Sequence, residues 1–235
     1  MNQTSERSFS MHETRKTKED ILTQVVRQEV NFLMLPFFFL DKKNKAKKAF
    51  IEYRETIKNG DKKLELLWRV SNYEHGLPGP LERKFHRAVE FILSTLPLPV
   101  KNPIPLGTYY RIVKLMDLPI SGWSYEQIKA IIQRIVHTTI TSEQVFYCKD
   151  KKKWAGGCFH LYDAVVFQGE QLDDSRIADT DYLYLSKYYL DNYNAGYTRL
   201  LDYSFSRSLS LVASRLYEIL SITFTFLEQG QSVKY

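Results

Sequence analysis

Two adjacent tyrosines, Tyr188 and Tyr189, are the side chains of this sequence best suited to covalent chemistry. A tyrosine hydroxyl can act as a nucleophile. In DNA-nicking enzymes it works beside a metal ion held by two histidines one residue apart on a strand. Here His160 has Tyr162 at that offset, so the histidine pair is missing. We therefore expect Tyr188 and Tyr189 to be packing residues, and the chain to have no catalytic site.

Other motifs that carry catalysis or bind cofactors are also missing from the sequence. It contains no glycine-rich phosphate loop ending in lysine, no GxSxG and no HExxH. Cys148 and Cys158 form no CxxC pair; a β-hairpin could bring them together, but we expect reduced thiols. The histidines lack metal-ligand spacing, and they are His12, His75, His86, His137 and His160. We expect no metal and no cofactor.

The composition is that of a folded protein with a mild positive charge. Of the 235 residues 44% are hydrophobic, and 33 Lys+Arg against 27 Asp+Glu give a net charge of +6. The sequence has no run of about 18 apolar residues, and its polar first residues contain no apolar segment of a secretory signal. It therefore predicts a protein that does not enter a membrane and stays in the cytoplasm.

The positive charge is distributed unevenly along the chain. Lysines and arginines gather at 42–48, 83–87 and 149–153, whereas 170–181 is acidic. Such basic clusters can neutralise the phosphates of a nucleic acid, but a lysine-rich loop also keeps the edge of a sheet soluble. For the 42–48 cluster both interpretations stand at this point.

The elements that would have to position a functional surface are clearest at 107–138. Thr108 can cap a first helix, which Pro119 ends. Ser124 and Gln127 then match a capping box, in which each side chain bonds the other residue's backbone amide. The pattern predicts two helices joined by a short turn.

The second of these helices has one apolar and one polar face. Its apolar stripe consists of Ile128, Ile131, Ile132 and Ile135. At 100° per residue the opposite face holds Glu126, Ala130, Gln133 and His137, flanked by Lys129 and Arg134. A helix with a polar outer face can enter the major groove of DNA, but helix-turn-helix pairs also serve in protein interfaces.

The segments TTITSEQVFYCK and CFHLYDAVVFQG follow this helix and predict two strands around the basic 149–153 loop. Helix, turn, helix, strand, basic loop, strand is the order of a winged helix-turn-helix. We therefore predict an α+β fold with antiparallel strands, in which 149–153 is the wing. Trp123 and Trp154 are expected to anchor the core.

Five further elements are expected around this unit. A helix is predicted over 19–30 and a buried aromatic strand over 31–40. The turn signal at 59–61 indicates a β-hairpin, and Pro80 suits the first position of the next helix. A last helix is predicted over 209–226.

Several segments together resemble the replication initiator protein A family of bacterial plasmids and related mobile elements. They are NFLMLPFFFLDKK, WRVSNYEHGLPGPLERKFHRAVEF, NPIPLGTYYRIVKLM, SGWSYEQIKAIIQRIVHTTI and FHLYDAVVFQGE with IADTDYLYLS. The resemblance covers residues 30–227. It implies a winged-helix protein that binds double-stranded origin repeats and recruits host replication proteins, and that is not a nuclease.

The resemblance places the helix-turn-helix on 108–138 and the wing on 149–153. It implies that Gln127, Gln133 and Arg134 approach base edges. The expected phosphate contacts are Lys129, Lys149, Lys151, Lys152 and Lys153, with Arg83, Lys84 and Arg87 as additional candidates. For Lys129 and Arg134, simple exposure to solvent is the alternative.

Initiators of this type often carry a second winged-helix domain. We expect a mobile polar arm at 1–18, a winged-helix initiator domain at 19–199, and at 200–235 a helix that begins a second, truncated winged-helix unit. The first winged domain of such proteins often serves dimerisation, so a homodimer is possible. Two alternatives to origin binding therefore stay open: a protein-interaction module for dimerisation or helicase recruitment, and a repressor of its own gene.

Overall fold

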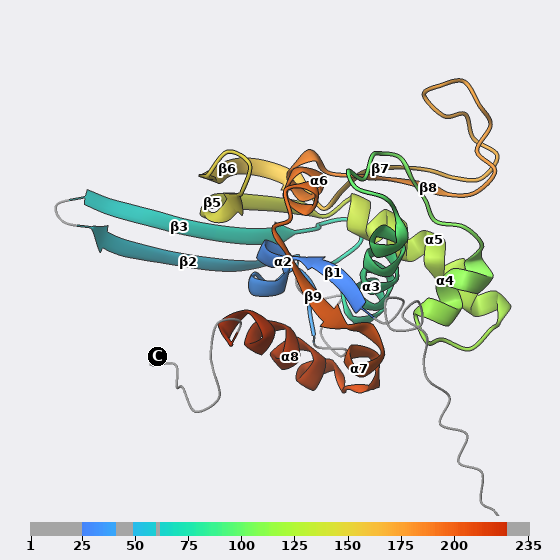
Figure 1. Ribbon diagram of the computed structural model, residues 1–235. Coiled ribbons are helices and arrows are strands. Elements are labelled where there is room, and N and C mark those ends of the chain that lie inside the picture. Colours follow the sequence, from blue (N-terminus) through green and yellow to red (C-terminus); the bar gives the residue numbers. More distant parts are fainter. Residues whose placement is uncertain (1–24, 41–48, 60–61, 225–235) are drawn as a thin grey trace, which may run out of the picture.

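The computed structural model describes residues 25–40, 49–59 and 62–224, which form an α+β fold with antiparallel sheets (Figure 1). In chain order the elements are β1 (Val25–Glu29), α2 (Val30–Met34), β2 (Phe50–Asn59), β3 (Lys62–Ser71), α3 (Pro80–Thr95), β4 (Ile104–Pro105), α4 (Tyr109–Leu115), α5 (Gly122–Val136), β5 (Thr139–Cys148), β6 (Lys153–His160), β7 (Tyr162–Val166), β8 (Tyr182–Leu185), α6 (Lys187–Asn194), β9 (Thr198–Asp202), α7 (Tyr203–Ser208) and α8 (Leu211–Thr223). The predicted arm at 1–18 and the lysine cluster at 42–48 lie outside the described residues. Within the described part of the chain, no helix is both long and apolar enough to cross a bilayer.

Helix α3 is the central helix of the fold, and it packs against β1, α4 and α5. As predicted, Pro80 occupies its first position, where a missing N–H costs nothing. The Glu82 carboxylate accepts a hydrogen bond from the Gly79 amide at 2.6 Å, which caps the first turn. Its inner face buries Phe85, Ala88, Val89, Ile92 and Leu93. Burial of this stripe positions the helix-turn-helix that follows.

The helix-turn-helix carries its own three-stranded sheet, with strand order β4-β8-β7. The chain runs α3, β4, α4, α5, then β7 and β8, which is the order of a winged helix, and β7 packs against α5. The predicted winged helix-turn-helix is therefore present. Its wing, however, is the 167–181 loop between β7 and β8, and β5 and β6 are inserted ahead of it.

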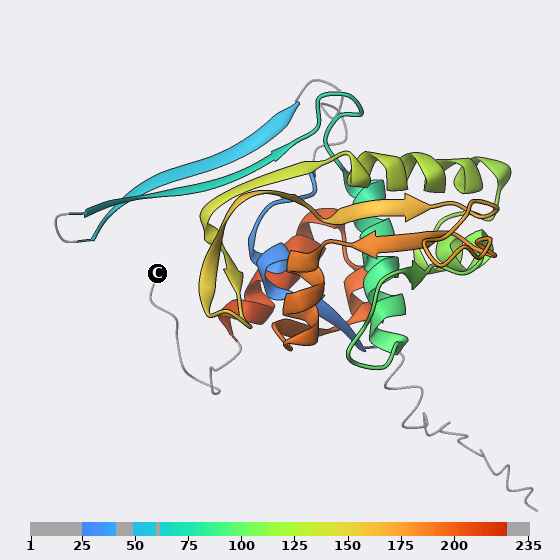
Figure 2. The same cartoon turned by 90° about the horizontal axis from the view of Figure 1, so that it is seen from above.

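A second sheet has the strand order β2-β3-β5-β6. The hairpin predicted at 59–61 is formed by β2 and β3, which pair along their whole length. β5 covers only 67–71 of β3, so the rest of the hairpin projects from the body (Figure 2). Between β5 and β6, Cys158 pairs with Thr141 rather than with Cys148, and both cysteines are free thiols.

The C-terminal elements pack back onto the N-terminal ones. β9 pairs antiparallel with β1, and α8 packs on α2. The helix predicted over 209–226 is present as α8. The expected boundary between residues 199 and 200 falls inside β9. That 200–235 begins a second winged-helix unit stays a prediction.

Two local predictions near the N-terminus are wrong. The segment expected to be helical over 19–30 contains strand β1, because its valines pair with β9, a partner that local periodicity does not reveal. The expected strand over 31–40 starts as the short helix α2, because the Glu29 carboxylate caps it by accepting from the Phe32 amide at 3.0 Å. The remainder is irregular and is fastened where the Trp68 indole donates to the Pro36 carbonyl at 2.8 Å.

Candidate nucleic-acid interface

The helix-turn-helix is built by two side-chain caps and one left-handed residue. Thr108 caps α4, as predicted, by accepting a hydrogen bond from the Arg111 amide at 3.3 Å. Asp117, at a φ of 54°, turns the chain after α4. Helix α5 then starts behind Ser121, whose hydroxyl accepts from the Ser124 amide at 3.2 Å. These contacts fix the direction in which α5 leaves the turn.

The capping box predicted at Ser124 is wrong, because α5 begins three residues earlier. Ser124 is buried, and its hydroxyl donates to the Pro119 carbonyl at 2.6 Å. Trp123, expected in the core, lies on the first turn of α5 with 55% of its surface exposed. Ile120 in the preceding turn is equally exposed, so an apolar surface stands at the N-terminal end of α5. Trp154 is exposed as well, on β6.

The outer face of α5 is polar and open to solvent. Its isoleucines are buried, as predicted. The exposed residues are Glu126, Lys129, Ala130 and Gln133. The Lys129 ammonium lies 5.1 Å from the ring centroid of Phe167, which begins the wing, so a cation–π contact joins helix and wing. Gln127 is half-buried on the flank of this face.

Arg134, on the flank of α5, is held by the protein itself. Its guanidinium forms an ion pair with Glu82, a fully buried residue of α3. Its Nε donates to the carbonyl oxygen of His75 at 2.9 Å. The resemblance implied that this guanidinium approaches base edges, and exposure to solvent was the alternative. In the structure a buried carboxylate binds it instead.

Arg83 and Arg87 are likewise engaged inside the fold, where both pair with Glu218 of α8. Burial disfavours ionisation of Glu218, but the guanidinium groups of Arg87, Arg83 and Arg215 hold its pKa below the usual value. Arg83 is buried and Arg87 half-buried, and both neutralise a carboxylate within the fold. Their phosphate contacts stay a prediction. Lys84, on the outer side of α3, is exposed.

The basic loop at 149–153 forms the tip of the β5–β6 hairpin, but it is not the wing of the helix-turn-helix. The Lys149 amide donates to Asn192 Oδ1 at 2.9 Å and its ammonium to the Gly196 carbonyl at 3.2 Å, which docks the tip on α6. Both views show this tip away from α5 (Figures 1 and 2). The exposed lysines at the tip are Lys149, Lys151, Lys152 and Lys153.

The wing at 167–181 is acidic. It carries Glu170, Asp173, Asp174, Asp179 and Asp181 against the single cation Arg176. Asp181 fastens its base, because one carboxylate oxygen accepts from the Gln168 amide at 2.9 Å and the other from the Tyr109 hydroxyl at 2.6 Å. Burial and this hydrogen bond raise the pKa of Tyr109. Such a wing repels phosphates, so the prediction of a cationic wing beside α5 is wrong.

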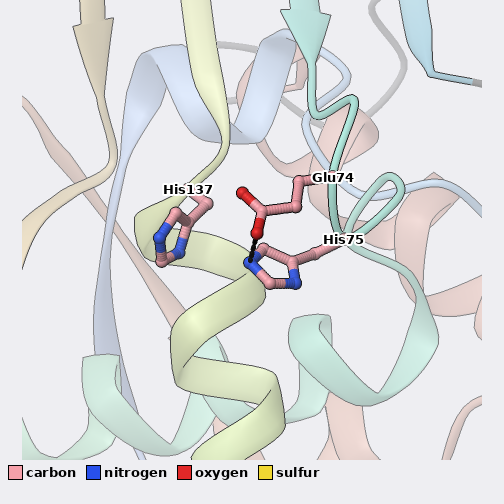
Figure 3. Close-up of side chains that lie close together, drawn as sticks. All are labelled: Glu74, His75 and His137. Atoms are coloured by element: carbon pink, nitrogen blue, oxygen red, sulfur yellow. Dashed lines mark ion pairs between the residues drawn. The ribbon is translucent and has the colours of Figure 1, made fainter.

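The two tyrosines considered as nucleophiles pack in the interior, as predicted. Tyr189 is fully buried, and burial raises the pKa of its hydroxyl. The Tyr188 ring centroid lies 4.7 Å from that of Phe159. Neither histidine spacing nor any other local pattern predicted a polar cluster that the fold creates at the end of α5, which consists of Glu74, His75 and His137 (Figure 3).

Comparisons with known proteins support the fold. The sequence matches no protein-family model and no curated protein. One similar solved structure is that of RctB domains 2-3, the fragment RctB-155-483, at 13% identity and a TM-score of 0.50, covering 77% of this chain and 66% of that one. Another is a selenomethionine derivative of domains 2 and 3 of RctB, at 14% identity and a TM-score of 0.48, covering 79% and 72%. At this identity the likeness shows a similar fold.

Proposed function

We propose that this chain is a DNA-binding initiator of plasmid-type replication that recognises double-stranded origin repeats through the outer face of α5. The observation that carries this proposal is the exposed polar face of α5 within a winged-helix order. The likeness of the fold to RctB domains 2-3 supports the winged-helix fold on which this proposal rests. In this proposal the protein acts in the cytoplasm by binding DNA and host replication proteins, with no catalysis of its own.

The exposed side chains of the helix-turn-helix divide into base and phosphate contacts. The Gln133 amide projects from the middle of the outer face, where it can donate to and accept from a base edge in the major groove. Lys129 stands on the same face, and Arg111 and Lys114 are exposed on α4. Because the wing is acidic, these three cations are assigned the phosphate contacts nearest the recognition helix.

The tip lysines at 149–153 and Lys84 are proposed as phosphate contacts outside the recognition helix. The tip lies away from α5, so a single straight duplex held by α5 would reach it only where the DNA is bent or extends past the helix (Figure 2). Removing tip lysines should therefore weaken binding to long DNA more than binding to a single repeat.

A mobility-shift titration against the repeats of the source element's own origin tests this function. Gln133→Ala should reduce the preference for the repeats over scrambled DNA, and Lys129→Ala should lower the slope of log affinity against log salt by about 0.9. The matched control is Lys187→Ala, which removes an exposed cation paired with Asp191 on α6. Equal binding of repeats and scrambled DNA at physiological salt would exclude specific recognition.

Self-association is a second candidate function, and the β2–β3 hairpin favours it. One face of the hairpin carries four exposed or half-buried hydrophobic side chains around the carboxylate of Glu55: Tyr53, Ile57, Leu64 and Leu66. Among the described strands β2 is an edge of its sheet, so its outer backbone groups are open to pairing with a second copy about a two-fold axis. In this role the chain would be a dimerisation module. A repressor of its own gene would use the same α5 surface.

A further inference from the structure

The three side chains at the C-terminal end of α5 meet although the sequence separates them widely. Glu74 and His75 lie in the turn after β3, and His137 is the C-cap of α5. Each offers one possible ligand atom, and these atoms all lie within 4.8 Å of one another. Figure 3 shows the carboxylate and the two imidazoles gathered around one point, and the imidazole centroids are 4.7 Å apart.

Hydrogen bonds fix the backbone that presents these side chains. Asn72 accepts from the His75 amide at 2.8 Å, while its amide group donates to the Arg134 carbonyl at 3.0 Å. From the opposite side, Arg134 Nε donates to the His75 carbonyl at 2.9 Å. The turn after β3 is thus bound to the last turn of α5 in both directions, and the two histidines are held as neighbours before any ligand arrives.

The chemistry of the cluster suits a metal cation. His137 Nδ1 can donate to the Gln133 carbonyl at 2.7 Å, which leaves Nε2 with a free lone pair. A ring nitrogen fixed in this way by a backbone carbonyl is the usual arrangement of metal-binding histidines. The end of the helix also favours positive charge, because the last carbonyl oxygens of α5 point toward it.

From this geometry we propose that Glu74, His75 and His137 bind one Zn²⁺ ion per chain. Two imidazole nitrogens and one carboxylate oxygen form a known zinc ligand set that leaves a fourth position for water, and imidazole ligands select zinc over magnesium or calcium. Ligand atoms of a closed tetrahedral site lie about 3.4 Å apart. The ligand atoms here lie within 4.8 Å of one another, and the exposed Glu74 carboxylate can rotate to bring its oxygen closer to the two imidazole nitrogens.

Through its coordination bonds the ion would link the end of α5 to the turn after β3. Through His137 it would hold the end of the helix whose outer face is proposed to contact DNA. Zinc binding is, however, independent of that function, because it requires only these three side chains. Its test therefore uses no DNA.

The experiment is a calorimetric titration of the full-length, EDTA-stripped protein with ZnCl₂, supported by the visible absorption of bound Co²⁺. We expect the wild-type protein to bind one equivalent of Zn²⁺. Glu74→Ala and His137→Ala should each lower the affinity for Zn²⁺ at least about tenfold, because even the loss of a residue that only hydrogen-bonds a metal ligand lowers metal affinity by that factor. The control is His160→Ala, which removes a histidine on β6 outside the cluster.

Two results would overturn the proposal. One is the absence of saturable Zn²⁺ binding by the wild-type protein below about 1 mM. The other is wild-type affinity in Glu74→Ala, which removes an exposed side chain and so leaves the core intact even if a histidine variant does not fold. Equal loss of affinity in His160→Ala would also count against this site.

Discussion

Replacing Arg134 by alanine should destabilise the fold, whereas replacing its neighbour Gln133 should not. In the sequence both residues are candidates for base contacts on one helix. In the structure the Arg134 guanidinium neutralises the fully buried Glu82 and donates to the His75 carbonyl, while Gln133 is exposed. The two variants therefore test whether tertiary pairing, and not DNA contact, explains Arg134.

The size of the effect follows from the burial of Glu82. Removing one partner of a buried ion pair costs about 3–5 kcal/mol, because the other charge is left without compensation. Since the Arg134 side chain is 26% exposed, we expect the lower end, about 3 kcal/mol. For a chain of this length that corresponds to a fall in melting temperature of about 6–12 °C. An exposed substitution such as Gln133→Ala should stay within about 0.5 kcal/mol.

Urea unfolding of the wild-type protein, Arg134→Ala, Glu82→Gln and the double variant measures this directly, and Gln133→Ala is the control. The double-mutant cycle should show a coupling between Arg134 and Glu82, because the second substitution removes the carboxylate charge with which the guanidinium pairs. A free energy of unfolding for Arg134→Ala within about 0.5 kcal/mol of the wild-type value would refute the reasoning. In that case the ion pair would not contribute to stability. Loss of DNA binding by this variant would then indicate that Arg134 contacts DNA directly.

Three further predictions concern the interior and the hairpin. Burial raises the pKa of Glu29 to about 7 from 4.5. The protonated Glu29 therefore contributes stability to the fold that is fully present below pH 4.5 and is lost as the pH rises through 7. Glu29→Gln should remove about 3 kcal/mol of this pH dependence, measured by urea unfolding across that window; an unchanged pH profile would contradict it. Glu218→Gln should cost about 3–5 kcal/mol in urea unfolding, because it leaves buried guanidinium groups without their carboxylate, and a neutral effect would show that α8 is not docked as described. Ile57→Ser should weaken self-association in sedimentation equilibrium without lowering the melting temperature, since Ile57 is exposed; a monomeric wild-type protein would exclude the dimer.

Local pattern was enough to predict the helices of the winged unit. Pro80 begins α3, Thr108 caps α4 and the isoleucines of α5 are buried, because propensity, capping and periodicity act within a few residues. The same pattern misplaced the start of α5, since Ser121 and Ser124 are both acceptable caps. Two hydrogen bonds distinguish them: the Ser121 hydroxyl accepts from the Ser124 amide, and the Ser124 hydroxyl donates to the Pro119 carbonyl.

The amino-acid sequence by itself therefore determined the helix-turn-helix, its polar outer face and the basic segments of this protein. The tertiary structure alone decided which charges are free. It places Arg83 and Arg134 against buried carboxylates, moves the lysines of 149–153 to another sheet, and makes an acidic loop the wing. It also joins His75 to His137. The physical reason is range: capping and periodicity act over neighbouring residues, whereas ion pairs, strand order and ligand clusters depend on contacts between segments far apart in the chain.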